Sequence, residues 1–198
     1  MTVMAERMSQ MSVEEFEQIA RFAAKQFEGV RLEFIDGRIG IKGMTDGNHS
    51  TIIMWLIRQC MQARPELDLN PVAGLQVDAY PKGRAQPDGV LAPTEHFAGQ
   101  GDWADPRGVL MTVEVTSYDS DTHARDRVEK PMAYAEAQIP VYLLIDRDNS
   151  TLTVHSNPDP ERSRYRDTHT VGFGEQVALP DPVGIVLDTE ILKRYAVR

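Results

Sequence analysis

The chain of 198 residues is 41% hydrophobic and 26% charged, which is typical of a folded globular protein and excludes a disordered chain. Its formal net charge of −9 argues against a general nucleic-acid-coating surface, because phosphate binding relies on clustered lysine and arginine. A cleft that is locally basic, or neutralised by a metal ion, stays compatible with that charge.

The length fits one domain, and we find no linker long enough to divide it. We expect a single domain over residues 1–198, with a core at about residues 12–156 and a C-terminal β-type extension at about 157–198. No apolar stretch approaches the roughly 18 residues of a membrane span, and the first residues lack the layout of a signal peptide. The expected location is therefore the cytoplasm. The single cysteine, Cys60, excludes an intramolecular disulfide and lies in an apolar run, which predicts a buried structural thiol.

The N-terminal region predicts a helix followed by a β-hairpin. Ser12 and Glu15 have the pattern of a capping box before apolar residues at helical spacing, and the helix should end near Gly29. Two β-prone runs then flank Asp36-Gly37, a pair that favours the positive φ angles of a tight hairpin turn.

The remainder of the chain alternates between helical and β-type patterns. A second, largely buried helix is expected between a cap at Asn48 and a stop before Pro65. The β-type runs at 72–80 and 87–93, separated by turn-rich residues, are expected to be neighbouring strands. The other predictions are, in chain order, an exposed loop at 96–108, a strand at 109–117, a helix at 121–138, paired strands at 141–148 and 151–156, further β-type runs, and a short closing helix near 188–196. This order favours an α/β fold with helices packed on a mixed β-sheet.

Three carboxylates stand inside or beside these apolar runs. Glu114 lies between Val113 and Val115 in a run typical of a central strand, where an unpaired carboxylate is costly to bury. Asp88 begins one strand and Glu114 lies within the next, so their side chains can lie next to each other across a sheet. Glu33 stands in the first strand of the predicted hairpin.

Two carboxylates at that distance repel each other unless a cation or a proton lies between them. Mg²⁺ takes oxygen ligands, typically one or two carboxylates together with water and phosphate. The positions therefore predict a divalent-metal site formed by Asp88 and Glu114, with Glu33 completing the set. Each residue also has an ordinary interpretation on its own: Asp88 in a Pro-Asp-Gly turn, and Glu33 and Glu114 at exposed or ion-paired strand positions.

Two further side chains are candidates for contact with a substrate. Lys130 lies on the helix expected to pack against the sheet, where an ammonium could orient water or stabilise phosphate charge. Pro131 follows it, so the helix either begins again there or bends. His49, at the start of the second helix, could contact phosphate. A solvated helix lysine and a capping or surface histidine are the alternatives.

Taken together, LEFIDGRI around Glu33, QPDGVL around Asp88, TVEVTS around Glu114 and DRVEKPMAYAEAQIPVYLLID around Lys130, with His49 opening the second helix, resemble the Uma-two family of putative restriction endonucleases. The similarity spans roughly residues 12–156. That family belongs to the PD-(D/E)XK nuclease superfamily, whose motif is an acidic pair on strands followed by a lysine.

The resemblance implies a restriction-endonuclease-like fold in which Asp88 and Glu114 are metal ligands and Glu33 is an additional acidic residue. It also implies that Lys130 is the catalytic lysine, moved to the helix, because Thr116 stands where the motif has lysine. The implied cofactor is Mg²⁺, for which Mn²⁺ can substitute.

Two hypotheses follow. The first is a metal-dependent endonuclease that hydrolyses phosphodiester bonds, with DNA favoured over RNA and a homodimer expected by analogy. In it, Asp88 and Glu114 hold the metal ion, Lys130 positions the attacking water, and Glu33 assists. The second is a catalytically silent module that keeps the fold for nucleic-acid or protein binding, which the acidic charge and Pro131 favour. Neither involves a membrane.

Overall fold

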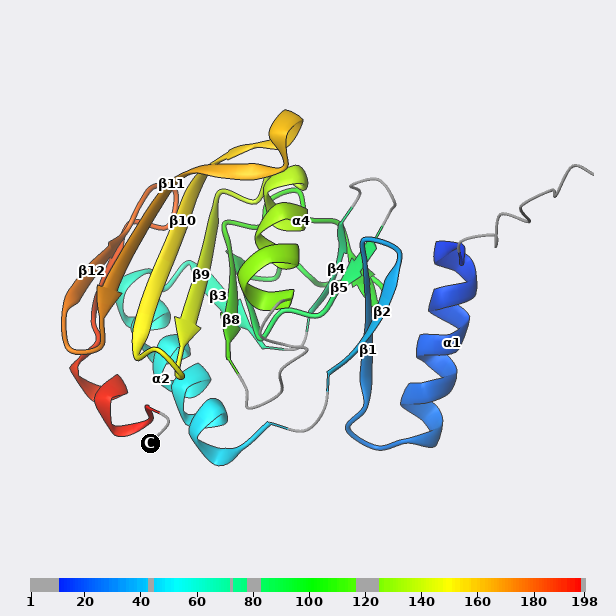
Figure 1. The fold of residues 1–198 in the computed structure, drawn as a ribbon, viewed down its shortest axis with the longest axis horizontal. Helices are drawn as coiled ribbons and strands as arrows, with labels where there is room; N and C mark the ends of the chain where they lie inside the picture. Colours follow the sequence, from blue (N-terminus) through cyan, green and yellow to red (C-terminus); the bar gives the residue numbers. More distant parts are fainter. Residues whose placement is uncertain (1–10, 43–44, 72, 78–82, 117–124, 197–198) are drawn as a thin grey trace, which may run out of the picture.

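The computed structural model describes residues 11–42, 45–71, 73–77, 83–116 and 125–196. The helical elements of these ranges are α1 (Val13–Gln26), α2 (Gly47–Ala63), a π-helical turn (Arg125–Glu129), α4 (Lys130–Glu136) and two 3-10 turns (Pro160–Arg162 and Glu190–Arg194). Figure 1 shows α1 at one end of the molecule, next to the β1–β2 hairpin, and α4 packed on the middle strands.

The strands of the described ranges form three sheets. The small sheet has the order β2-β1-β5-β4-β7, the central sheet has the order β11-β10-β9-β8-β6-β3, and β12 pairs with β13. The strands are β1 (Arg31–Ile35), β2 (Arg38–Lys42), β3 (Leu67–Asn70), β4 (Gly74–Val77), β5 (Gly83–Ala85), β6 (Gly89–Pro93), β7 (Trp103–Ala104), β8 (Met111–Val115), β9 (Val141–Asp146), β10 (Thr151–Asp159), β11 (Arg164–Gly172), β12 (Gln176–Leu179) and β13 (Ile185–Asp188).

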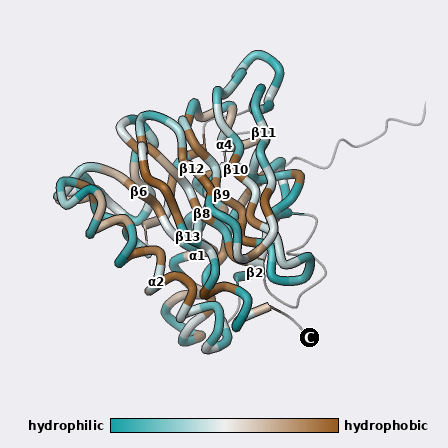
Figure 2. The backbone as a smooth tube through the Cα atoms, turned by 90° about the vertical axis from the view of Figure 1, so that its left-hand side faces the viewer, coloured by the Kyte–Doolittle hydropathy of each residue, from teal (hydrophilic) through white to brown (hydrophobic). Residues whose placement is uncertain are grey.

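The central sheet is buried on both faces because its middle strands alternate side chains between two cores. In β9, Val141, Leu143 and Ile145 pack with α2 and with β12–β13, whereas Tyr142 and Leu144 pack with α4 and the small sheet. Burial on both faces explains why such strands are near-continuous apolar runs in the sequence. Figure 2 shows hydrophobic stretches along the middle strands of the fold.

The predicted N-terminal helix and hairpin are confirmed. Ser12 Oγ accepts a hydrogen bond from Glu15 N at 3.2 Å, and Glu15 Oε2 accepts one from Ser12 N at 2.8 Å, which is the complete capping box. Asp36 and Gly37 have φ angles of 50° and 72° in the turn between the antiparallel strands β1 and β2. The predicted α/β fold with a mixed sheet flanked by helices is confirmed as well.

Two predictions about the middle of the chain are wrong. The runs at 72–80 and 87–93 are not neighbouring strands, because β4 belongs to the small sheet and β6 to the central sheet. The turn-rich residues between them include β5, which pairs with β4 and β1. The absence of a side chain at Gly83 lets β5 lie close to β1, since a Cβ at Gly83 would lie 2.6 Å from Phe34 O. The loop predicted at 96–108 likewise contains β7, which pairs with β4.

The second helix starts earlier than predicted, and its cap is Asp46 rather than Asn48. Asp46 Oδ1 accepts a hydrogen bond from His49 N at 2.8 Å, while Arg147 Nη1 donates to Asp46 Oδ2 at 2.8 Å. A carboxylate held by a guanidinium is a strong acceptor for the free N–H groups of a first helical turn. The cap therefore fixes the backbone of His49 at the start of α2.

The helix predicted at 121–138 changes geometry at Lys130, and its residues 121–124 lie outside the described ranges. Arg125–Glu129 form a π-helical turn, and α4 then begins at Lys130 with Pro131 in its first turn. Proline is favoured at that position because its missing N–H would have no partner within the helix. The helix thus begins again at the proline, which was one of the two expected outcomes. No helix within the described ranges is long and apolar enough to span a membrane.

The structure makes Cys60 chemically inert. Its side chain is fully buried in the core with α2, and burial raises the pKa of the thiol to about 12. We therefore expect no reaction of the native protein with a thiol-specific chromogenic disulfide in mildly alkaline buffer, and one equivalent after unfolding in guanidinium chloride. Rapid labelling of the native chain would contradict the packing of α2.

Candidate active site

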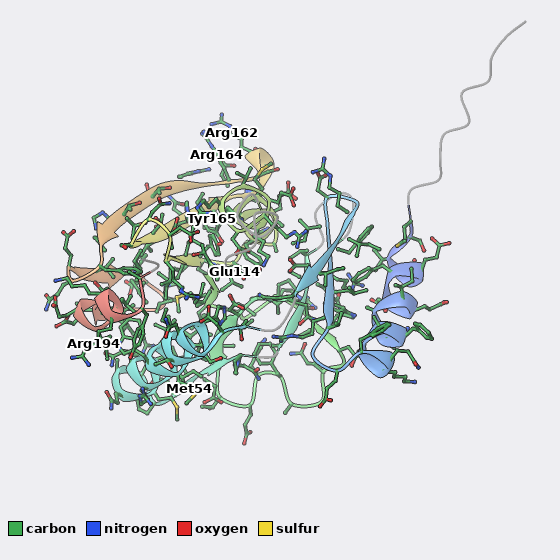
Figure 3. The ribbon with its side chains drawn as sticks, turned by 60° about the horizontal axis from the view of Figure 1, so that its bottom comes forward. Met54, Glu114, Arg162, Arg164, Tyr165 and Arg194 are labelled. Carbon is green, nitrogen blue, oxygen red and sulfur yellow. The ribbon has the colours of Figure 1, made fainter. Side chains whose placement is uncertain are left out.

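Asp88, directly before β6, and Glu114, on the antiparallel neighbour β8, lie side by side. Gly89 of β6 opposes Val113 of β8, and Asp88 N donates a hydrogen bond to Val113 O at 3.0 Å. Asp88 Oδ2 accepts a hydrogen bond from Val115 N at 2.8 Å. Because Val113 and Val115 face the α2 core, the alternation directs Glu114 towards α4 and the small sheet. Figure 3 shows Glu114 in the interior of the fold.

Three oxygen atoms of this region surround one point, which we call the cation position. Asp88 Oδ1, Glu114 Oε2 and Gln86 O lie 2.8, 3.0 and 2.6 Å from Lys42 Nζ, which stands at that point. Lys42 is the last residue of β2, and its side chain is 10% exposed, compared with 3% for Asp88 and none for Glu114. An ammonium group thus compensates the two carboxylates.

Glu33 adds a third carboxylate from β1. Its Oε1 accepts a hydrogen bond from Arg125 Nη1 at 3.1 Å, and its Oε2 accepts one from Gln86 N at 3.3 Å. Gly40 lies opposite Glu33 on β2, and a Cβ added there would lie 2.2 Å from Arg125 Nη1. The missing side chain at Gly40 is what allows the guanidinium to reach Glu33.

Lys130 occupies the centre of a second group of carboxylates. Its Nζ lies 3.0 Å from Glu114 Oε2, 3.0 Å from Asp126 Oδ1 and 3.4 Å from Glu33 Oε2. The side chain is 1% exposed, and its ammonium has no partner in aligned hydrogen-bond geometry among the described residues. The attraction is therefore that of buried ion pairs.

Two further side chains, His49 and Tyr134, orient the pair of acids. His49 Nε2 lies 3.0 Å from Asp88 Oδ2, and Tyr134 OH donates a hydrogen bond to Glu114 Oε1 at 2.9 Å. These contacts hold Asp88 Oδ2 and Glu114 Oε1. The other oxygen of each carboxylate, Asp88 Oδ1 or Glu114 Oε2, therefore faces the cation position. His49 is 5% exposed, and its contact is with Asp88; binding of substrate by His49 stays a prediction.

Burial and neighbouring charge act in opposite directions on the two acids. Burial opposes ionisation of Asp88, but Lys42 and the contact with His49 hold the pKa of that carboxyl well below its usual range. For Glu114 burial prevails over Lys130 and Lys42, and its pKa is raised. Glu114 is thus the acid whose negative charge is less fully compensated.

The oxygens at the cation position suit a hard divalent ion in their chemistry. Carboxylates and backbone carbonyls are the ligands that Mg²⁺ and Mn²⁺ take. In the wider site, four carboxyl groups face two ammonium groups and one guanidinium: Asp88, Glu114, Glu33 and Asp126 lie around Lys42, Lys130 and Arg125.

The predicted three-carboxylate set is only partly assembled. Asp88 and Glu114 share the cation position, whereas the Glu33 carboxylate contacts Arg125 and Lys130. Accordingly, no group of three His, Cys, Asp or Glu side chains in the described ranges is arranged to hold a metal ion.

Sequence reasoning missed five participants: Lys42, Arg125, Asp126, Tyr134 and the carbonyl of Gln86. Lys42 shares a hairpin face with Glu33 by strand alternation, and Asp126 precedes Lys130 by four residues on the predicted helix. Both signals were present in the sequence. Nothing in the sequence distinguishes the carbonyl of Gln86 from any other carbonyl.

Replacing Lys130 by methionine is expected to leave three buried carboxylates without their shared counter-ion. The free energy of unfolding, measured with urea, should fall by about 3–5 kcal/mol. Lys193→Met is the matched control, because Lys193 pairs with Glu190 at an exposed site and such pairs contribute about 0–1 kcal/mol. Equal stabilities of the two variants would mean that Lys130 does not hold the cluster together.

Comparisons with known proteins identify the family and the fold of the chain. No curated protein matches the chain. Among solved structures, the crystal structure of a putative nuclease belonging to DUF820 from Anabaena variabilis matches with a TM-score of 0.67 and 17% sequence identity, covering 94% of this chain and 99% of that one. This likeness shows a shared fold. The family model of Uma2, described as "Putative restriction endonuclease", matches residues 13–190. The resemblance found in the sequence is thereby confirmed, and the chain belongs to the Uma2 family.

Proposed function

We propose that this chain is a metal-dependent endonuclease that hydrolyses phosphodiester bonds in DNA. The observation that carries the proposal is the cation position, where oxygens of Asp88, Glu114 and Gln86 converge within 3.0 Å of one positive charge. Membership of a family described as restriction endonucleases supports nucleic acid as the substrate. A homodimer that cuts two strands is proposed by analogy.

In this proposal, Asp88 and Glu114 hold Mg²⁺ or Mn²⁺ together with the Gln86 carbonyl. A divalent ion there would supply Lewis-acid stabilisation of phosphate charge and a more acidic water. His49 keeps Asp88 in position through Asp88 Oδ2, and Tyr134 keeps Glu114 in position through Glu114 Oε1.

Glu33 and Lys130 have different parts in the proposal. Glu33 is linked to the cation position through Gln86, whose N–H donates to Glu33 Oε2 and whose carbonyl oxygen faces the cation position. From there Glu33 assists the metal ion or the water. The burial of Lys130 among Glu114, Asp126 and Glu33 favours a role in fixing the acids over direct contact with water or phosphate.

The second candidate is a catalytically silent module that binds nucleic acid or protein. The observation that favours it is the ammonium of Lys42, which already compensates Asp88 and Glu114, together with the net charge of −9. The two candidates differ in whether the purified chain cleaves a polynucleotide in the presence of divalent ions.

The test is incubation of supercoiled plasmid DNA with the purified chain and Mg²⁺ or Mn²⁺. We expect nicking or linearisation that chelation abolishes, and a loss of at least about 100-fold in Asp88→Asn and Glu114→Gln, because ligand loss should exceed the effect of losing a supporting contact. A single-stranded RNA and a single-stranded DNA of matched sequence, assayed in parallel, separate the two substrate classes.

Asp159→Asn is the matched control, since Asp159 is also buried and ion-paired, with Arg166 at 3.3 Å, but belongs to β10 and not to the site. It should cleave as the unmodified chain does. Cleavage that persists in both site variants would reject the proposed residues, and no cleavage of any substrate would favour the silent module.

A further inference from the structure

The ammonium of Lys42 stands where a metal ion would bind. Its three oxygen neighbours are two carboxylates and a backbone carbonyl, at 2.6 to 3.0 Å. This is a ligand set for a hard cation, and a lysine ammonium is a compact point charge with three donors. Lys42 therefore satisfies, with one group, the atoms that the proposed function assigns to Mg²⁺ or Mn²⁺.

Lys130 has a different position, and the contacts of its ammonium do not include Asp88 Oδ1 or Gln86 O. It shares only Glu114 with Lys42, and its other carboxylate neighbours are Asp126 and Glu33. If Lys42 moved away, Glu114 would keep one ammonium contact, whereas Asp88 would lose the positive charge at its Oδ1 and keep His49 at its Oδ2. Asp88 Oδ1 and Gln86 O would then lose the ammonium, while Glu114 Oε2 would keep Lys130 at 3.0 Å.

Lys42 is also the lysine that can leave. Its side chain is 10% exposed, compared with 1% for Lys130, and it extends from the end of β2 on a flexible stem of four methylene groups. We infer that a change of side-chain rotamers moves the ammonium from the site to water, where it is fully hydrated. No rearrangement of the strands that carry Asp88 and Glu114 is needed.

We propose that Lys42 is a resident counter-ion that a divalent metal ion must displace, so that the site exchanges between a lysine-closed form and a metal-loaded form. The proposal rests on the proposed function, because it uses the same metal ligands. A site closed by its own lysine binds metal with an affinity reduced by the fraction of molecules that are open. Lys42 would thereby set the metal concentration at which the protein becomes loaded.

The test is titration of the purified chain with Mn²⁺, in which the free ion is measured by electron paramagnetic resonance. Lys42→Met removes the competing charge and retains the apolar length of the side chain, so it should bind one Mn²⁺ at least about tenfold more tightly than the unmodified chain. Lys42→Arg retains a charge and should not gain affinity in this way. Arg38→Met is the matched control for general loss of positive charge, because Arg38 is on the same strand and exposed.

The outcomes separate this inference from the proposed function. The inference is supported if Lys42→Met binds Mn²⁺ more tightly than the unmodified chain and the other variants do not. It is also supported if only Lys42→Met binds Mn²⁺ tightly enough to detect. Equal or weaker binding in Lys42→Met, with binding that Asp88→Asn abolishes, overturns the inference and leaves the proposed metal site standing. Equal gains in Lys42→Met and Arg38→Met also overturn it. Absence of Mn²⁺ binding in every variant overturns both.

A second measurement uses the unmodified protein and does not depend on the folding of a variant. The chain has only five lysines, so nitrogen-15 lysine labelling gives a simple spectrum of ammonium groups. Buried ammonium groups exchange their protons slowly. On saturation with Mg²⁺, the slowly exchanging signal of Lys42 should disappear and that of Lys130 should remain. Retention of the Lys42 signal with Mg²⁺ bound would overturn the exchange.

Discussion

The burial of four carboxylates in one cluster is the constraint on which the site and the packing around it depend. Isolated ionised carboxylates are too costly to remove from water, so each one must have a positive charge or a hydrogen-bond donor beside it. The chain brings those partners from separate elements: Lys42 from β2, His49 from α2, Arg125 from the π-helical turn, and Lys130 and Tyr134 from α4. The small sheet, the central sheet and two helices are therefore held together at one point by charge as well as by apolar packing.

Local backbone geometry makes these contacts reachable. The Asp46 cap fixes the start of α2, from which His49 meets Asp88. The new helix start at Lys130 and Pro131 places one ammonium among three acids, and Gly40 leaves space for Arg125. Strand alternation in β8 then turns Glu114 away from the apolar α2 core. These features belong to different parts of the sequence, yet together they serve Asp88, directly before β6, Glu114 on β8 and the neighbouring Glu33 on β1.

Much of the fold was predictable because its signals are local. The capping box at Ser12, the hairpin at Asp36-Gly37 and the apolar runs of β8 and β9 depend on neighbouring residues only. The assignment of strands to sheets was not predictable. It depends on β5, which joins β4 to β1, and β5 has no apolar alternation that would reveal it as a strand. In the site, the adjacency of Asp88 and Glu114 followed from strand order. Strand alternation places Lys42 on the same hairpin face as Glu33, but nothing in the sequence shows that its side chain reaches Asp88 and Glu114 of the central sheet.

In the proposed site, Asp88, Glu114 and the carbonyl of Gln86 form one cation position that a metal ion takes from Lys42. Anomalous diffraction from crystals soaked with Mn²⁺ tests it most directly. We expect a single strong peak with oxygens of all three residues within about 2.0–2.6 Å, and the Lys42 ammonium displaced from its contacts. Crystals that hold Mn²⁺ elsewhere, or that keep Lys42 between the two carboxylates at saturating Mn²⁺, would contradict it.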